Sequence, residues 1–289
     1  MNNNANDIYQ KFHELSDEQY LELLCRAEQE PVIDGVVMPG FPDEAFQKGS
    51  VGSAGGRTLR HEGFKFYSTI KRYASEFGVT LDSNTAILDF GVGWGRMIRF
   101  FYKDIPSEGI FGIDVMPEMV DVCKKTLPSG KYSVSSPLPP TGFADNSFDI
   151  IFAYSVFSHL RDDAAEAWIK EFSRILKPNG IVVATTEGKA FLDKCEYYQK
   201  HPEKAADSIW HQMISEGFSP IEKFREKFDN GEFSYVAFGG GGVLDGSFYG
   251  DCVIPPQYVE NVFGKYLIFK DYDEALSYLP QAVFVLQKG

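Results

Sequence analysis

Cysteine is scarce in this sequence, and the cysteines that occur are scattered. No two of them form a C-x-x-C pair, and the five histidines form no ligand-like cluster with them. This spacing predicts reduced, mostly buried thiols of an intracellular protein, and it argues against a disulfide framework or a structural metal site. We therefore expect no metal in the chemistry of this chain. The four cysteines are Cys25, Cys123, Cys195 and Cys252.

Basic residues and long apolar runs are also lacking. The 289 residues include 28 Lys and Arg against 41 Asp and Glu, which gives a net charge of −13. Because phosphate binding needs a concentrated basic surface, this balance argues against nucleic acid as a partner. No apolar run approaches the roughly 20 residues that cross a bilayer, and the first residues lack the order of a signal peptide. We expect a cytoplasmic enzyme or binding protein with no membrane partner.

What the sequence does contain is an alternation of short apolar runs with helical patterns. Helices are predicted over 96–105, 117–127 and 163–176, and Asp163 with Glu166 resembles a capping box at the start of the last one. This alternation indicates βαβ units and a parallel α/β sheet. Two late runs predict an antiparallel strand pair at the end of that sheet. The predicted strands are 86–90, 110–115, 132–134, 148–154 and 181–185, followed by the late pair 266–269 and 282–287.

The segments outside this alternation have a different composition. Residues 7–30 suit one or two amphipathic helices, and residues 64–77 suit another helix that ends at Gly78. Between them, residues 31–63 are rich in Gly, Pro and Ser and should be irregular. Residues 189–265 hold many aromatic residues around a run of four glycines. Aromatic residues at this density can build a lid over an acceptor, or they can form the core of the segment itself.

The most informative motif is a glycine-rich turn after the first strand of the alternation, ILDFGVGWGR at residues 87–96. Asp89 lies near the end of the strand, and three glycines follow at alternate positions, Gly91, Gly93 and Gly95. Glycines let the backbone pass close to a ligand, and the following helix N-terminus offers free N–H groups. The dinucleotide fingerprint would place its third glycine at Arg96, so a nicotinamide-dependent oxidoreductase is the weaker interpretation.

This motif resembles the first motif of class I S-adenosylmethionine-dependent methyltransferases. Three later segments agree with that family in order and spacing, namely FGIDV ending in Asp114 and Val115, PLPPTGFADNSFDIIFAYSVFSHL, and RILKPNGIVVAT. The resemblance covers about residues 63–186 and implies a Rossmann-like seven-stranded sheet, mostly parallel with an antiparallel last strand. GVGWGRMIRFF and AYSVFSHL are similar to a bacterial branch of stand-alone methyltransferases whose substrates are mostly unassigned.

The resemblance implies S-adenosylmethionine as the cofactor. Asp89 would receive its ammonium group, directly or through water, and Asp114 would hold the two ribose hydroxyls. Met116 and Leu138 would sandwich the adenine. Arg96 would pair either with the cofactor carboxylate or with a nearby acid of the protein. The predicted cofactor-binding residues are Asp89, Gly91, Gly93, Gly95, Arg96, Asp114, Val115, Met116, Leu138, Tyr154 and Ser155.

Two residues are candidates for the catalytic base. His159 lies just beyond the fourth strand of the family pattern, and its imidazole titrates near the working pH. Its other interpretation is a structural hydrogen bond that anchors the loop. Glu187 follows the fifth strand, at the edge where α/β proteins bind ligands, and could equally be a solvated carboxylate.

These parts predict an organisation and a function. We expect an N-terminal helical arm and loop at 1–62, a cofactor-binding core at 63–188, a cap or acceptor insertion at 189–265, and a final strand pair at 266–289. The leading hypothesis is methyl transfer to a small-molecule or glycan acceptor at a hydroxyl, with nitrogen and carboxylate acceptors also open. A non-catalytic module that binds S-adenosylmethionine is the alternative from another class.

Overall fold

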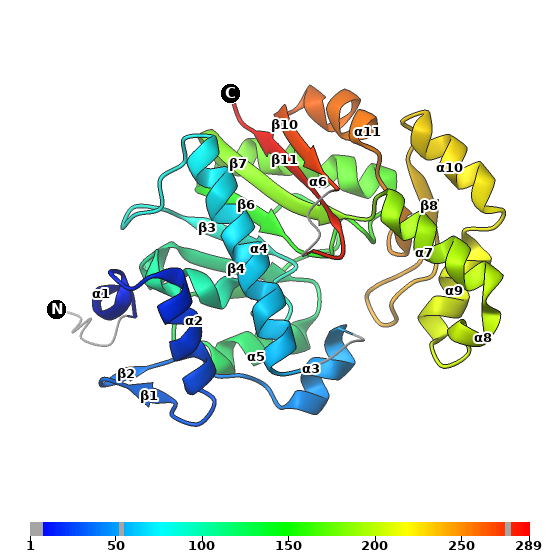
Figure 1. Ribbon diagram of the computed structural model, residues 1–289. Coiled ribbons are helices and arrows are strands. Elements are labelled where there is room, and N and C mark those ends of the chain that lie inside the picture. Colours follow the sequence, from blue (N-terminus) through cyan, green and yellow to red (C-terminus); the bar gives the residue numbers. More distant parts are fainter. Residues whose placement is uncertain (1–7, 52–54, 275–278) are drawn as a thin grey trace. The chain divides into compact units, whose positions relative to one another are not determined.

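The computed structural model describes residues 8–51, 55–274 and 279–289. Seven strands form one mixed sheet (Figure 1). In order across the sheet they are β10 (Ile268–Asp273), β11 (Ala282–Gln287), β7 (Leu176–Thr186), β6 (Phe148–Ala153), β3 (Ile87–Phe90), β4 (Ile110–Asp114) and β5 (Lys131–Val134). β3 runs parallel to β4 and β6, and β4 runs parallel to β5, whereas β11 is antiparallel to both β7 and β10. The mostly parallel α/β sheet with an antiparallel last strand is therefore confirmed.

The chain divides into two compact units, and each is described by itself. The first unit holds residues 1–135 and 147–152, and the second holds 136–146 and 153–289. Among the described residues, no helix is both long and apolar enough to cross a membrane. All four cysteines are free thiols; Cys25 is partly exposed and the other three are buried, as predicted.

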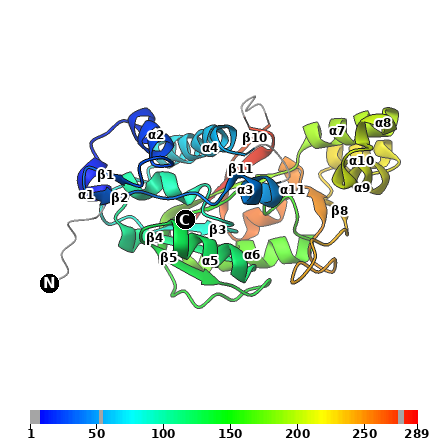
Figure 2. The same cartoon turned by 90° about the horizontal axis from the view of Figure 1, so that it is seen from below.

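The first unit begins with two short helices, α1 (Ile8–Phe12) and α2 (Asp17–Arg26). Ser16 caps α2 through a capping box with Gln19, which satisfies free N–H groups at the helix start. The longer helix α4 (Arg57–Glu76) runs beside α2 (Figures 1 and 2). It buries one apolar stripe and ends, as predicted, before Gly78, whose φ of 78° is the left-handed conformation that glycine adopts easily. The remaining regular helices are α3 (Glu44–Val51) and α5 (Pro117–Thr126).

The described part of residues 31–63 contains regular elements, contrary to the expectation from its composition. Asp34 and Gly35 form a left-handed two-residue turn between β1 (Val32–Ile33) and β2 (Val36–Val37), which is the usual signal of a tight hairpin. The α3 helix follows, and Asp43 Oδ1 accepts the Phe46 N–H at 2.8 Å at its start. The high content of Gly, Pro and Ser suggested an irregular segment, although the Asp34–Gly35 turn and the Asp43 cap are local signals of a hairpin and a helix.

The helix predicted over 96–105 is also different, because the chain forms the 3₁₀ helix η1 (Ile98–Lys103) there. Arg99 turns its side chain back, and its Nε donates to the Gly95 carbonyl at 2.8 Å. That carbonyl is the acceptor that an α-helix would give to the Arg99 backbone N–H. A second short 3₁₀ turn, η2 (Ser107–Gly109), leads into β4.

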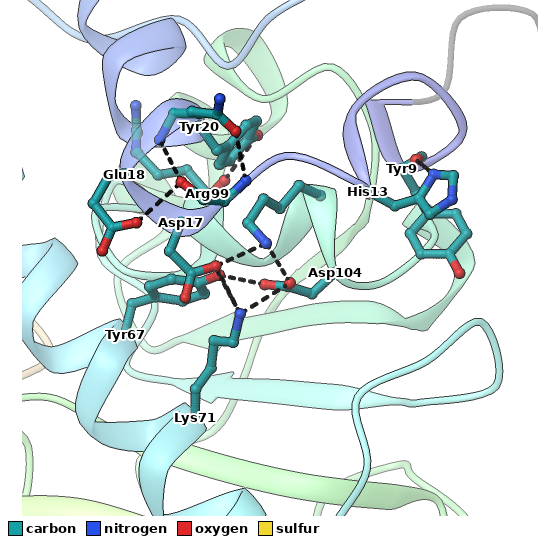
Figure 3. Close-up of polar contacts among 12 residues, drawn as sticks. Tyr9, His13, Asp17, Glu18, Tyr20, Tyr67, Lys71, Arg99 and Asp104 are labelled. Carbon is teal, nitrogen blue, oxygen red and sulfur yellow. Dashed lines mark hydrogen bonds and ion pairs between the residues drawn. The ribbon is translucent and has the colours of Figure 1, made fainter.

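A cluster of five polar side chains ties α2 to α4 and η1, and we call it the arm cluster (Figure 3). It contains Asp17, Tyr67, Lys71, Lys103 and Asp104. Each lysine lies within 3.2 Å of both carboxylates. The two ammonium groups therefore balance the two carboxylates, and the tyrosine hydroxyl fills the space between them.

The second unit combines three sheet strands with helices. Four helices that follow β7 gather at one end of the unit (Figures 1 and 2). They are α7 (Lys189–Lys200), α8 (Pro202–Ala205), α9 (Ile209–Gly217) and α10 (Ile221–Asp229). The other elements are α6 (Asp162–Ile175), the antiparallel pair β8 (Ser234–Val236) and β9 (Asp251–Val253), α11 (Pro256–Asn261) and η3 (Phe263–Lys265).

Three predicted boundaries in this unit were wrong for local reasons. α6 starts at Asp162 without the predicted capping box, because Asp163 binds the Arg161 guanidinium and Glu166 accepts the Tyr266 hydroxyl. β7 begins at Leu176 rather than at 181, since the Asn179 N–H donates to the Lys288 carbonyl and extends the pairing beyond β11. β10 spans 268–273, so it includes acidic residues that were expected to lie between the two late strands.

Candidate active site

The glycine-rich turn lies in the first unit, directly after β3. Its shape depends on three positive φ values, 76° at Gly91, 51° at Gly93 and 80° at Gly95. A Cβ on Gly95 would lie 2.6 Å from Leu127 Cδ1, so this position needs glycine for packing. A Cβ on Gly93 would meet nothing within 4 Å. The turn therefore has open space at its middle glycine, as a loop that passes close to a ligand requires.

Asp89, on β3 just before this turn, is a buried acid with an unused oxygen. Only 2% of its surface is exposed, and among the described residues its Oδ2 has no hydrogen-bond partner. Burial, followed by the charge of Asp114, raises the pKa of this carboxyl well above its ordinary value. A buried acceptor without a partner costs free energy, so this oxygen suits a donor such as an ammonium group.

Asp114 ends β4 and faces the same turn. Its Oδ2 accepts the Gly93 N–H at 2.8 Å, and its Oδ1 accepts the Met116 N–H at 2.9 Å. Burial raises its pKa, although backbone N–H groups of Met116, Gly93 and Val115 oppose that rise. Each oxygen keeps a further lone pair for another donor. The turn, Asp89 and Asp114 are thus brought together, and the acceptor oxygens of the two acids fit the ammonium group and the ribose hydroxyls of S-adenosylmethionine.

Arg96 has a protein partner in this structure. Its Nη1 lies 3.5 Å from Glu62 Oε1 on α4, which is the second of the two pairings expected from the sequence. Val115 and Met116 follow Asp114 and are partly exposed. Their contacts with the cofactor remain predictions.

The other predicted residues lie in the second unit. Leu138 is 48% exposed, and Tyr154 is partly buried just beyond β6. Ser155 follows with a left-handed φ of 58°, a strained conformation for a serine of the kind that clusters at active sites and ligand-binding segments. Its N–H donates to Thr185 Oγ1 at 2.7 Å, and its hydroxyl accepts Gln281 Nε2 at 3.1 Å. These bonds hold the strained backbone in place.

His159 and Glu187 belong to one buried polar group, which we call the base cluster. It contains His159, Glu187, Trp210, Asp251 and Gln281. His159 Nδ1 lies 2.8 Å from the Gly250 carbonyl oxygen and 3.1 Å from Asp251 Oδ1. Among the described residues, its Nε2 has no hydrogen-bond partner.

The charges of the base cluster shift both titrating groups. Burial alone would lower the pKa of His159, but its bonds to Asp251 and Gly250 and the charge of Glu187 outweigh burial and raise it above 6.5. Burial raises the pKa of Glu187, although the Gln281 amide, which donates to Oε1 at 3.0 Å, and the charges of Lys194 and His159 partly oppose that rise. The two predicted base candidates therefore influence each other.

Three residues of the base cluster were missed at the sequence level. Asp251 begins the short apolar run DCVI, and an acid at the start of a buried strand is the signal that could have marked it. Gln281 directly precedes the last strand in the same way. Trp210 carried no signal beyond its residue type, because its Nε1 meets Asp251 only through the fold.

Several aromatic residues of the cap segment form a core of their own. Phe218 and Phe228 are buried in a cluster with residues of α7, α9 and α10, and Phe224 and Phe238 pack against it. Of the two roles left open for these aromatics, core formation is confirmed for these four. Tyr249 differs, because its ring stacks on His159 with centroids 5.0 Å apart. Within the described part of the chain, no group of three or more His, Cys, Asp or Glu residues is placed to hold a metal.

Comparison with known proteins finds a family model and relatives that are similar to part of this chain. Residues 87–180 match the family model described as a methyltransferase domain. An uncharacterized methyltransferase of Bacillus mycoides (strain KBAB4) is 29% identical over 157 residues, which is 53% of this chain and 70% of that protein. An uncharacterized methyltransferase-like protein of Schizosaccharomyces pombe is 32% identical over 100 residues, which is 35% of this chain and 37% of that protein.

One of the solved structures similar to this chain is the magnesium protoporphyrin IX methyltransferase of Synechocystis with bound SAH. It is 11% identical and covers 80% of this chain and 84% of its own, with a TM-score of 0.47. The family assignment rests instead on the matched domain, the strand order and the glycine turn with its two acids. Residues 87–180 thus match a methyltransferase domain, and the relatives and the fold support a class I S-adenosylmethionine-dependent methyltransferase with S-adenosylmethionine as its cofactor.

Proposed function

We propose that this enzyme methylates a hydroxyl of a small-molecule or glycan acceptor, with His159 as the base. The observation that carries the proposal is the hydrogen bonding of His159, whose Nδ1 is held while Nε2 has no partner among the described residues. Its side chain is 23% exposed, so the ring is partly accessible to solvent. An imidazole arranged in this way has one nitrogen available to take a proton.

A hydroxyl acceptor makes the most use of such a base. S-adenosylmethionine carries the transferred methyl group on a sulfonium. When the sulfur–carbon bond breaks, the sulfur leaves as a neutral thioether. The acceptor oxygen must lose its proton as the oxygen–carbon bond forms, and His159 Nε2 would receive that proton. A carboxylate acceptor is already deprotonated at neutral pH and would need no base. Nitrogen acceptors remain a second class, since an amine in its neutral form also releases a proton after transfer.

Tyr249 supports an acceptor with a ring or a sugar face. Tyr249 is not part of the hydrophobic core cluster of the cap segment, and its ring stacks on His159. Aromatic faces next to a few polar groups are typical of sites for small molecules. We infer that the acceptor binds beside Tyr249, within reach of His159.

The cofactor roles are proposed on the same basis. Asp89 Oδ2 would accept the ammonium group, the open side of Gly93 would give room for the amino-acid end, and Asp114 would bind the ribose hydroxyls. Val115, Met116 and Leu138 would pack on the adenine, with Tyr154 and Ser155 beside the cofactor. Arg96 would keep its pairing with Glu62 rather than bind the carboxylate.

Titration calorimetry with S-adenosylmethionine tests the cofactor site with a matched pair of variants. Gly93→Arg should abolish binding, because its side chain enters the open space beside the turn. Gly93→Ala carries the same backbone cost at a φ of 51° and should retain binding within a few-fold. Equal binding by wild type and Gly93→Arg would contradict the site.

An acceptor screen tests the proposed reaction. Phenols, sugars, amines and carboxylic acids would be incubated with the wild-type enzyme and S-adenosylmethionine, and S-adenosylhomocysteine release would be measured. Turnover with hydroxyl compounds supports the proposal. Turnover confined to carboxylates would overturn it, and tight cofactor binding without any turnover would favour the binding module.

A further inference from the structure

The Nδ1 atom of His159 is surrounded by acceptors. The Gly250 carbonyl oxygen lies at 2.8 Å and Asp251 Oδ1 at 3.1 Å, and neither of these groups can donate when the acid is ionised. Nδ1 must therefore carry the hydrogen whether the ring is neutral or charged. In the neutral ring, the lone pair is then on Nε2, which is the nitrogen without a protein partner.

Asp251 is itself fixed by the cap segment. It is the first residue of β9, its side chain is 5% exposed, and its Oδ2 accepts Trp210 Nε1 at 3.0 Å. Trp210 lies on α9, and Lys194 on α7 approaches its ring face at 5.0 Å. The carboxylate thus has one oxygen on the histidine and the other on a residue whose position depends on the folded cap helices.

The backbone around β9 keeps this pair in register. The Gly250 N–H donates to the His159 carbonyl, and the Cys252 N–H donates to the Ser158 carbonyl, each at 2.8 Å. The Arg161 N–H donates to the Phe248 carbonyl at 2.9 Å. Residues 248–252 therefore run alongside 158–161, and the contact between the two side chains follows from a paired backbone rather than from one flexible rotamer.

We infer that Asp251 is a positioning residue for this methyl transfer: it holds the Nδ1–H of His159 so that Nε2 is the basic nitrogen, and Trp210 fixes Asp251. This inference rests on the proposed role of His159. It also assigns the cap segment a part in the chemistry besides acceptor binding, because the partner of the base comes from that segment.

The charges around His159 set the direction of the expected titration. Asp251 on β9, Glu187 after β7 and the Gly250 carbonyl favour the protonated ring, whereas burial disfavours it. Tyr249 covers one face of the ring, and Lys194 acts on Glu187. With Asp251→Asn, the negative charge is lost and burial remains, so the pKa of His159 should fall.

Nuclear magnetic resonance of the imidazole nitrogens tests the positioning directly, with neither acceptor nor cofactor present. Wild type should show one tautomer, protonated at Nδ1, and a raised titration midpoint. Asp251→Asn should lower the midpoint and mix the tautomers. Trp210→Phe keeps the carboxylate but removes the hydrogen bond that fixes it, so it should change the tautomer and the midpoint in the same direction as Asp251→Asn but by less. An unchanged tautomer and midpoint in folded Asp251→Asn would overturn the inference.

Kinetics then separate positioning from a purely structural role. Asp251→Asn should lower kcat by on the order of tenfold to a hundredfold, with the KM for S-adenosylmethionine unchanged, and should move the acidic limb of the kcat profile to lower pH. A changed tautomer with an unmoved kcat profile would also overturn the inference. If wild type shows no transfer at all, the proposed function fails, while the imidazole titration still decides whether Asp251 orients the ring.

Discussion

The arm cluster and the base cluster are both buried groups of ionisable side chains, but their charges are arranged differently. In the arm cluster two lysines lie within 3.2 Å of two carboxylates, and the charges balance. In the base cluster one histidine contacts Asp251 and is influenced by the charge of Glu187, and its second nitrogen has no partner within the described chain. When every charged group of a cluster has a protein partner, the cluster has no group left for a ligand. A cluster in which one nitrogen has no partner can exchange a proton there.

This difference also appears in the directions of the pKa shifts. In the arm cluster, burial would raise the pKa of Asp17, yet Lys103, Lys71 and Tyr67 lower it and so stabilise the charged form. In the base cluster, the pKa of Glu187 is raised because burial prevails. Perturbed acids that are not compensated by a cation are candidates for function, whereas compensated ones belong to structural ion pairs.

The largest effect is expected from His159→Ala. Loss of a general base costs about 10²–10⁴-fold in turnover, while binding of S-adenosylmethionine should be unchanged because that site uses other residues. Turnover with an identified acceptor is the measurement. His13→Ala is the control, since His13 is an exposed residue of the first unit whose Nδ1 lies 3.0 Å from the Tyr9 carbonyl oxygen. Near-normal turnover by His159→Ala would show that His159 is not the base. The base cluster would then have only a structural role, like the arm cluster.

The second prediction concerns stability and removes one cation from the arm cluster. Lys103 is 4% exposed in its side chain, so Lys103→Met leaves Asp17 and Asp104 with one ammonium group between them. The free energy of unfolding should fall by about 2–4 kcal/mol, as measured by urea denaturation. Lys189→Met is the control, because its pair with Asp229 is 3.5 Å long and exposed, and it should cost under about 0.5 kcal/mol. Equal losses in both variants would argue against a saturated buried cluster.

The arm cluster should also make the protein sensitive to acid in a defined window. The folded pKa of Asp17 is lowered from 3.8, so its contribution to stability is complete above 3.8 and is lost as pH falls through the lower folded value. Denaturation at several pH values should show this loss in wild type and a smaller one in Asp17→Asn. An identical acid profile for the two proteins would contradict the assigned shift.

The sheet and the glycine turn could be predicted because their signals are local. Apolar runs that alternate with helical patterns mark β3 to β7, and the acid–glycine spacing marks the cofactor turn. The hairpin at Asp34 and Gly35 was missed although its signal is local, because the surrounding composition suggested a loop. The 3₁₀ form of η1 could not be predicted, since it depends on where the Arg99 side chain turns.

The base cluster could be predicted only in part. His159 and Glu187 follow strands at the expected edge, so the family pattern pointed to them. Three more members of the cluster lie far from His159 in the sequence: Trp210 is 51 residues away, Asp251 is 92 and Gln281 is 122. No pattern of fixed spacing links residues so far apart, because their contact depends on how the cap segment folds.

The smallest effect separates the two base candidates within their cluster. Glu187 raises the pKa of His159 by its charge alone and less than Asp251 does, so Glu187→Gln should lower that pKa only slightly. If Glu187 acts only electrostatically, kcat should fall by less than about tenfold. The folded pKa of Glu187 is raised above 4.5, so wild-type stability should decline as pH rises through that folded value. Glu187→Gln should flatten this decline, which thermal denaturation between pH 4 and pH 8 can measure. If Glu187→Gln instead abolishes turnover while His159→Ala does not, Glu187 is the base and His159 has the structural role, because the group that accepts the proton must be the one whose loss stops the reaction.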